Sequence, residues 1–182
     1  MIELKAKVRE QKGKGAAHQA RAAGEIPGVL YGGKSTNLML SLNHKEVAEG
    51  LKKMADDSAI LSLSVTGGKK PGSFTVITRE VQRHFRDWKI QHVDFQKVDP
   101  DATITLDVPV VPVGDWTDQM GKGSILLHRT LKLKGKAKHL PGAIKVPVDT
   151  LEEGQKIAVK DLKLPEGVQA LRSPEAVIIQ KA

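Results

Sequence analysis

His92 and Asp94 are separated by one residue in a stretch that alternates apolar and polar side chains. On a strand this spacing places the imidazole and the carboxylate on one face, where they could form an acid–base pair or, with His84, part of a metal site. No further ligand stands at a recognisable spacing, and the chain has no cysteine for thiolate or disulfide chemistry. We therefore predict no catalytic site, no metal site, no phosphate-binding glycine loop, no cofactor and no small-molecule substrate.

The charge of the chain is unevenly distributed. Residues 1–99 hold 17 Lys and Arg against 11 Asp and Glu (net +6), whereas residues 100–182 hold 12 against 10 (net +2). A surplus of this kind favours an anionic partner, and it belongs mainly to the first half. The first residues, MIELKAKVRE, contain no continuous apolar segment, and no later run approaches 18 apolar residues. We expect a cytoplasmic protein that is neither exported by a standard signal nor membrane-spanning.

The first half alternates between strand patterns and two helical patterns. Ala-rich residues 16–23, closed by Gly24, predict a helical turn, and Asn43 followed by an apolar period of three to four predicts a helix over 44–54. Period-two patterns predict the strands 2–8, 28–31, 37–42, 59–66, 73–82 and 89–98. The connections are too short for repeated βαβ units, so residues 1–98 are predicted to form a small, mostly antiparallel, closed or half-closed barrel.

After the sequence DPD at 99–101, prolines become frequent and short β-rich runs are separated by glycine turns. We predict a second all-β domain over 99–182, joined by a connector too short to be flexible. The fold class is therefore mainly β (α+β), with an N-terminal barrel carrying one or two helices.

Basic and hydrogen-bonding side chains follow one another through the first part of the chain. They are Lys5, Lys7, Arg9, Lys12, Lys14, His18, Arg21 and Tyr31. A second basic cluster contains Arg79, Arg83 and Arg86. Such residues suit contacts to phosphates and 2′-hydroxyl groups. A solvated basic face, with Tyr31 at the rim of the core, is the alternative.

The few aromatic residues favour duplex or structured RNA over single strands, which are bound on several stacked aromatics. Phe95 shares strand parity with Val93 and is expected in the core, which leaves His92 and Asp94 facing outward. A carboxylate on an RNA-binding surface can accept hydrogen bonds from a guanine amino group or a 2′-hydroxyl.

The residues GKGAA, GEIPGVLYGG and VQRHFRDWKIQHVDFQKVD resemble the bacterial large-subunit ribosomal protein bL25 family, in its longer two-domain form known as the CTC or general stress protein family. The resemblance extends over nearly the whole chain through VPVVPVG, PGAIKVPVDTLEEGQKI and VKDLKLPEGV. It implies a non-catalytic, monomeric, ribosome-associated component of the large subunit. It also implies that the N-terminal barrel binds an irregular internal loop of 5S ribosomal RNA.

The RNA contacts implied by the resemblance are Arg9, Lys14, Arg21, Tyr31, Gln82, His92 and Asp94. Six of these lie on the basic stretch or on the outward polar face already described, and Gln82 comes from the resemblance alone. The family usually has further arginines at His18 and Gln19 and commonly a proline at Phe85. We expect Tyr31 to lie beside Lys14 and Arg21.

A second hypothesis remains open at this point. The protein could act off the ribosome as a general stress protein, with the proline-rich second half as a protein-interaction module. Segment 114–124, GDWTDQMGKGS, does not closely match the family and could hold a contact peculiar to this chain.

Overall fold

The computed structural model describes residues 2–11, 13–33, 37–68, 71–114, 124–148, 151 and 155–181. The helices and strands are β1 (Ile2–Val8), α1 (Lys14–Ala22), β2 (Glu25–Tyr31), β3 (Asn37–Asn43), α2 (His44–Asp56), β4 (Ile60–Thr66), β5 (Gly72–Arg83), β6 (Ile90–Lys97), β7 (Thr103–Val113), β8 (Ser124–Leu126), β9 (Thr130–Lys136), β10 (Ile144–Pro147), β11 (Lys156–Ala158), β12 (Gln169–Ala170) and β13 (Val177–Lys181). Two short 3-10 helices, η1 (Ala137–His139) and η2 (Val159–Asp161), lie in the second half. Neither helix in the described part of the chain has the length and the apolar run needed to span a membrane.

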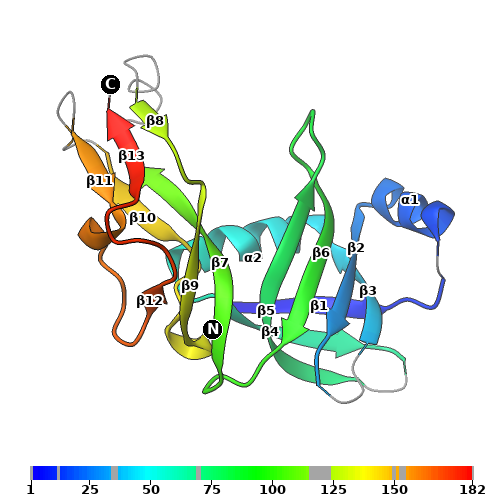
Figure 1. Cartoon of the computed structure of the whole chain (residues 1–182). Coiled ribbons are helices and arrows are strands. Elements are labelled where there is room, and N and C mark those ends of the chain that lie inside the picture. Colours follow the sequence, from blue (N-terminus) through cyan, green and yellow to red (C-terminus); the bar gives the residue numbers. More distant parts are fainter. Residues whose placement is uncertain are drawn as a thin grey trace.

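The first six strands close into a barrel, as the sequence predicts, and the structure gives their order as β1-β3-β2-β6-β5-β4 (Figure 1). Four of the six pairs are antiparallel. The other two, β1 with β4 and β2 with β6, are parallel and join strands that are not consecutive in the chain. The barrel therefore closes without the consecutive βαβ units that the short connections exclude.

Side chains of alternate strand positions fill the barrel. In β1, Leu4 and Ala6 are buried while Lys5 and Lys7 are exposed, which confirms the predicted alternation. Leu, Val and Phe side chains from the other five strands complete this interior. Burial of this apolar surface is the main stabilising contribution to the barrel.

The two helices form as local sequence signals require. The Asn43 side chain accepts hydrogen bonds from the backbone N–H groups of Lys45 and Glu46, and so caps α2. A Cβ at Gly50 would lie 2.6 Å from Leu4 Cδ2, so this glycine lets α2 approach β1 closely. The α1 helix is longer than the predicted turn, and it ends before Gly24, whose φ is 78°.

In its described residues, the second half is all-β apart from two 3-10 helices, as predicted. Its strands form one sheet in the order β10-β7-β9-β12 and another in the order β11-β13-β8 (Figure 1). Alternate residues of β7 and β9, such as Val108, Leu131 and Leu133, meet in a second hydrophobic cluster. Ile60 and Ile77 of the barrel strands belong to this cluster as well, so the two halves share part of their apolar packing.

Backbone contacts also join the two halves. Ala59 N–H donates to the Leu140 carbonyl at 2.9 Å, and Gly142 N–H donates to the Asp57 carbonyl at 3.3 Å. A Cβ at Gly142 would lie 1.7 Å from the carbonyl oxygen of Met54. The segment after η1 therefore packs directly against the end of α2, with no room for a side chain at position 142.

Candidate nucleic-acid interface

The outer surface of strands β2, β6 and β5 brings four of the predicted residues together. Val93 and Phe95 are fully buried in the barrel, so His92 and Asp94 on β6 face outward, as predicted. His92 pairs with Gln82 of β5, and Asp94 pairs with Val29 of β2. Tyr31 follows two residues after Val29 on β2. We refer to the surface formed by Tyr31, Gln82, His92 and Asp94 as the barrel face.

The His92 and Asp94 side chains are in contact and are both 26% exposed. His92 Nδ1 lies 2.6 Å from Asp94 Oδ1, which makes an ion pair when the imidazole is protonated. The contact does not meet hydrogen-bond geometry, and Oδ1 is shielded from solvent without a hydrogen bond. The carboxylate is therefore positioned by His92, and its Oδ1 has no hydrogen-bond partner within the described residues.

Gln82 reaches this surface because of an irregularity in β5. The register between β5 and β6 shifts between Thr78 and Glu80, which leaves Arg79 as an extra residue. Val76 points into the barrel, and strict alternation from it would point Gln82 inward as well. The bulge reverses the alternation and places Gln82 outside, opposite His92. Its Nε2 donates to Glu80 Oε1 at 3.0 Å.

Tyr31 lies at the far end of β2 from α1. It pairs with Asn37 of β3 and Gln96 of β6 and is partly exposed. The Arg21 contact to β6 is at Gln91, five residues before Gln96, or roughly 16 Å along a strand. The expectation that Tyr31 lies beside Arg21 and Lys14 is therefore wrong, because β2 runs away from α1 after Glu25.

The α1 helix adds two basic residues at the other end of β2. Arg21 Nη1 donates to the Gln91 carbonyl at 3.4 Å, which holds this half-buried side chain next to the strand that carries His92. Lys14 is exposed at the first position of α1, and the first turn contains no acidic residue. A positive side chain at a helix N-terminus adds to the positive end of the helix dipole. This part of the surface therefore favours anions.

Arg9 is less accessible than the alternation of β1 predicts. Its Nε and Nη1 are buried without a hydrogen-bond partner, in contrast to the exposed Lys5 and Lys7. It lines a hollow under α1 together with Glu25 and Ser41, whose side chains are hydrogen-bonded to each other. The α1 helix covers the end of β1, so the sequence-predicted row of three outward cations is reduced to two.

The three arginines of the second basic cluster do not form one patch. Arg79 donates to Gln96 Oε1 at 2.7 Å and to the Thr105 carbonyl at 2.8 Å, so it connects the barrel to β7. Arg83 donates to the Trp88 carbonyl at 3.3 Å, and Arg86 lies 5.2 Å from the centre of the Phe85 ring. All three side chains are exposed, but only Arg83 and Arg86 lie at the turn between β5 and β6.

Residues 28–35, GVLYGGKS, match the G-x-x-x-x-G-K-S pattern of a phosphate-binding loop, contrary to the expectation that the chain contains no such motif. The structural context of that motif is absent here. Gly28 lies within β2, where a Cβ would meet the Val93 carbonyl at 2.8 Å, and β2 leads to the antiparallel strand β3 and not to a helix. Gly28 thus serves close packing of β2 on β6.

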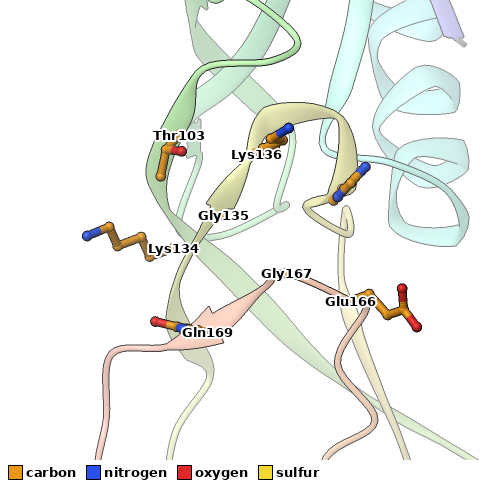
Figure 2. Close-up of a pocket in the computed structure, with 8 residues that line it drawn as sticks. Thr103, Lys134, Gly135, Lys136, Glu166, Gly167 and Gln169 are labelled. Carbon is orange, nitrogen blue, oxygen red and sulfur yellow. The ribbon is translucent and has the colours of Figure 1, made fainter.

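The second half carries another basic surface. Lys132, Lys134 and Lys136 are exposed at alternate positions of β9. Lys134 and Lys136 border a hollow of about 450 Å³ with Thr103, Glu166 and Gln169 (Figure 2). Most of segment 114–124, in which we expect a contact peculiar to this chain, lies outside the described residues.

Comparison with known proteins covers both halves. The Ribosomal L25p family matches residues 4–95, and the family of the C-terminal domain of ribosomal protein TL5 matches residues 103–181. The chain is 34% identical to the large ribosomal subunit protein bL25 of Aromatoleum aromaticum over 96% of this chain and 87% of the relative. The bL25 proteins of an Azoarcus species (35% identity; 96% and 87% coverage) and of Moorella thermoacetica (33%; 96% and 84%) are similarly close. On this similarity and on its closed six-stranded barrel, the chain belongs to the ribosomal L25p family.

Proposed function

We propose that this protein is a structural, non-catalytic component of the large ribosomal subunit that binds 5S ribosomal RNA through the barrel face. It acts in the cytoplasm, as one copy on the ribosome. The proposed contacts are Arg9, Lys14, Arg21, Tyr31, Gln82, His92 and Asp94. The names of its relatives support the ribosomal role.

The observation that carries the proposal is the arrangement of Gln82, His92 and Asp94 on adjacent strands. An amide, an imidazole and a carboxylate lie on one surface, next to the cations of α1. Cations alone would suit any polyanion, but a partly buried carboxylate among them repels phosphate. It becomes useful where the partner presents donors, as the minor groove of A-form RNA does with its 2′-hydroxyls and guanine amino groups.

We propose that two groups of residues contribute differently to RNA binding. Lys14 and Arg21 contribute affinity by neutralising phosphates and releasing counterions, a contribution that weakens as salt increases. Gln82, His92 and Asp94 contribute selectivity, because their hydrogen bonds depend on the position of particular RNA groups. Arg9 is proposed as a contact only through Nη2 or after a small displacement of α1, since Nε and Nη1 are buried.

We also propose that residues 1–98 and 99–182 are two domains. This division agrees with the limits of the two family matches. The domains are not independent in packing, because Ile60 and Ile77 of the first contribute to the hydrophobic cluster of the second. Removal of residues 99–182 would expose these side chains, so experiments on RNA binding should use the full chain.

The test is a titration of the full chain against 5S ribosomal RNA and against an unrelated duplex RNA of equal length, each at two salt concentrations. We expect tight binding to 5S ribosomal RNA and a preference over the duplex that persists at the higher salt. Equal and salt-sensitive binding to both RNAs would refute the proposal. It would leave a nonspecific basic surface and direct the search for function to residues 99–182.

A further inference from the structure

The turn between β5 and β6, residues 84–89, exposes two aromatic side chains. Phe85 is 77% exposed and Trp88 is 65% exposed, more than any other large apolar residue in the described part of the chain. Figure 1 shows that the β5–β6 hairpin extends past the barrel, so these side chains lie at its tip. Exposed apolar groups that are placed together commonly mark a contact surface.

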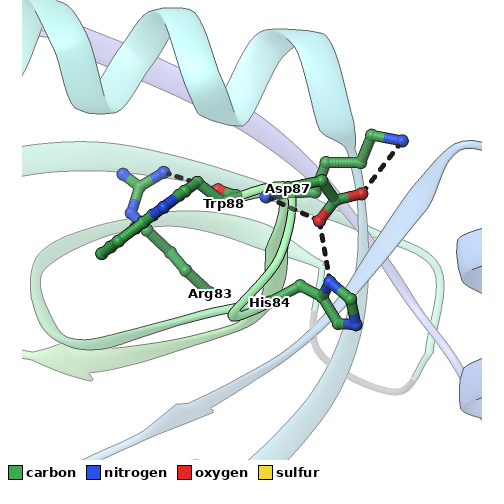
Figure 3. Close-up of polar contacts among 5 residues, drawn as sticks. Arg83, His84, Asp87 and Trp88 are labelled. Carbon is green, nitrogen blue, oxygen red and sulfur yellow. Dashed lines mark hydrogen bonds and ion pairs between the residues drawn. The ribbon is translucent and has the colours of Figure 1, made fainter.

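Polar contacts fix the conformation of this tip (Figure 3). Asp87 Oδ1 lies 2.9 Å from His84 Nδ1 and accepts a hydrogen bond from Lys89 N–H, while Oδ2 lies 3.2 Å from Lys89 Nζ. The backbone of His84 is bonded to both Trp88 and Lys89. Desolvation raises the pKa of Asp87, but hydrogen bonds and charge from Lys89 and the bond to His84 outweigh it and lower that pKa. The tip is thus a defined turn with an ionised carboxylate at its centre.

Trp88 has a φ of 55°, the one left-handed non-glycine residue in the described part of the chain. This conformation is unfavourable for a tryptophan and persists only where the surroundings impose it. Here the Trp88 N–H donates to the His84 carbonyl, and the Trp88 carbonyl accepts from Arg83. The backbone of the turn is therefore held in this conformation at Trp88, whose side chain is largely exposed.

The charges around the two rings indicate the kind of partner. Arg83, Arg86 and Lys89 flank the two rings in the sequence, and Asp87 is the only acid in residues 83–89. The Arg86 guanidinium lies 5.2 Å from the centre of the Phe85 ring. Aromatic residues and arginine are also enriched at protein–protein interfaces, but three cations against one carboxylate favour an anionic partner. Aromatic rings flanked by cations form an arrangement that can stack on nucleobases while neutralising phosphates.

The tip is continuous with the barrel face. Gln82 directly precedes Arg83 on β5, and His92 follows Lys89 after two residues on β6. The Arg21 side chain reaches the Gln91 carbonyl between them. An RNA held on the barrel face would therefore extend past the turn.

We propose that the β5–β6 turn is a second RNA contact, in which Phe85 and Trp88 stack on an unpaired nucleobase of the RNA held on the barrel face. This inference rests on the proposed function, because it takes the same RNA as the partner. The cations of the turn contact the flanking phosphates. The barrel face binds a structured region of the RNA, and the turn adds a stacking contact to a base beside that region.

Intrinsic fluorescence provides a direct test. The chain contains two tryptophans, Trp88 and Trp116, so the variant Trp116→Phe leaves Trp88 as the single reporter. Stacking on a base quenches indole fluorescence. We expect titration with 5S ribosomal RNA to quench Trp88, with a midpoint that matches the dissociation constant measured by filter binding for the wild-type chain.

Substitution tests the contribution to affinity. The double variant Phe85→Ala/Trp88→Ala should bind 5S ribosomal RNA about tenfold more weakly. Trp88→Tyr should retain most of the affinity, because it keeps an aromatic ring. Leu171→Ala is the matched control, since Leu171 is 51% exposed in the second half and should have no effect. Circular dichroism confirms that each variant is folded.

The outcomes separate the two proposals. If the wild-type chain binds 5S ribosomal RNA specifically, but Trp88 is not quenched and the double variant binds equally well, the turn is not an RNA contact and the barrel proposal stands. If that double variant also fails to join the large subunit, the turn binds a protein, and the inference is again wrong. If the wild-type chain does not prefer 5S ribosomal RNA, both proposals fail together.

Discussion

The barrel face and the β9 strand are both rich in hydrogen-bonding side chains, but they differ in how those side chains are held. On the barrel face, Gln82, His92 and Asp94 are of different chemical types, and each lies against a neighbour on the same or an adjacent strand. On β9, Lys132 and Lys134 are of one type and point into solvent, and the nearest carboxylate to Lys132, that of Asp107, is 4.0 Å away.

This difference separates a surface that can select a partner from one that can only attract it. Exposed lysines neutralise phosphate wherever it lies. Their contribution to affinity depends on the salt concentration and not on the sequence of the RNA. Side chains whose positions are fixed bind well only where the partner presents matching groups. The comparison therefore predicts that removing a carboxylate weakens RNA binding on the barrel face but not on β9.

The comparison also requires that the two surfaces belong to one rigid unit, and Gly142→Ala should break that unit. The new Cβ would lie 1.7 Å from the Met54 carbonyl, which is backbone and cannot move without displacing the end of α2. We expect a loss of about 3 kcal/mol or more in the free energy of unfolding, at the upper end of overpacking effects. Thermal or urea unfolding of the full chain measures it.

Gly15→Ala is the control for that substitution. Gly15 lies inside α1, and a Cβ there would have no neighbour within 4 Å. It should stabilise the protein by about 0.5–1 kcal/mol, because alanine favours the helix. If Gly142→Ala unfolds at the same denaturant concentration as the wild type, the segment around Gly142 does not pack tightly against the end of α2.

Asp94→Ala tests selection on the barrel face. A purely electrostatic surface would bind RNA more tightly after losing a negative charge. If Asp94 accepts a hydrogen bond from RNA, the affinity for 5S ribosomal RNA should instead fall about 10- to 100-fold, the range for hydrogen bonds to charged groups. A filter-binding titration at fixed salt distinguishes the two results by their sign.

Asp107→Ala provides the matched variant on the second half, where the carboxylate lies 4.0 Å from Lys132 Nζ. We expect no weakening of RNA binding by this change. If Asp94→Ala and Asp107→Ala both leave binding unchanged or stronger, the barrel face would be no more selective than the β9 lysines.

Tyr31→Phe is expected to have a smaller effect. The phenol lies at the end of β2, beside Gln96 and away from α1, so its hydroxyl can contact RNA only at the edge of the barrel face. We expect binding to weaken about threefold to tenfold, the effect of one neutral hydrogen bond, with no change in the unfolding midpoint. An unchanged affinity would assign Tyr31 to the rim of the core.

The sequence allowed more of the fold than of the site to be predicted. The six barrel strands follow from period-two alternation and from glycine and proline at the turns, because these features act locally. The outward direction of His92 and Asp94 follows from the same rule. The outward position of Gln82 and the burial of Ile77 do not follow from this rule, because both depend on long-range geometry.

Strict alternation along β5 fails at the bulge at Arg79, and nothing in the local sequence marks that residue as unpaired. Alternation therefore assigns Gln82 to the wrong side. The same parity places Ile77 on the outer side of the barrel, where only the second half explains its complete burial. Two nitrogen atoms of the Arg9 guanidinium are shielded from solvent beside α1, a tertiary arrangement that the alternation of β1 cannot reveal.

The double variant Lys134→Ala/Lys136→Ala should have little effect on binding to isolated 5S ribosomal RNA. If the barrel face holds the RNA, the affinity should change by less than about twofold and the salt dependence should stay the same. Lys14→Ala is the comparison, since loss of one phosphate contact lowers the slope of log affinity against log salt by about 0.7–0.9. Equal reductions in slope from both variants would extend the RNA contact to β9.

The smallest expected effect concerns pH and the ion pair between Asp56 of α2 and Lys145 of β10, whose side-chain atoms are 2.7 Å apart. The hydrogen bond and charge of Lys145 lower the pKa of Asp56 below its usual 3.8. Because the pKa is lower in the folded state, the pair stabilises the protein above pH 3.8, and this contribution is lost as pH falls through the folded value. Both side chains are more than half exposed, so solvent and salt screen the effect.

Melting temperatures of the wild type and of Asp56→Asn, measured from about pH 6 to about pH 3, isolate this contribution, because the other carboxyl groups titrate alike in both proteins. We expect the wild type to melt slightly higher at about pH 6 and the difference to decrease as the pH falls below 3.8. A difference that is constant across this range would mean that Asp56 contributes packing and not charge to the junction. The two halves would then be held together by the apolar cluster, the backbone contacts and the hydrogen bond from Arg79 to the Thr105 carbonyl.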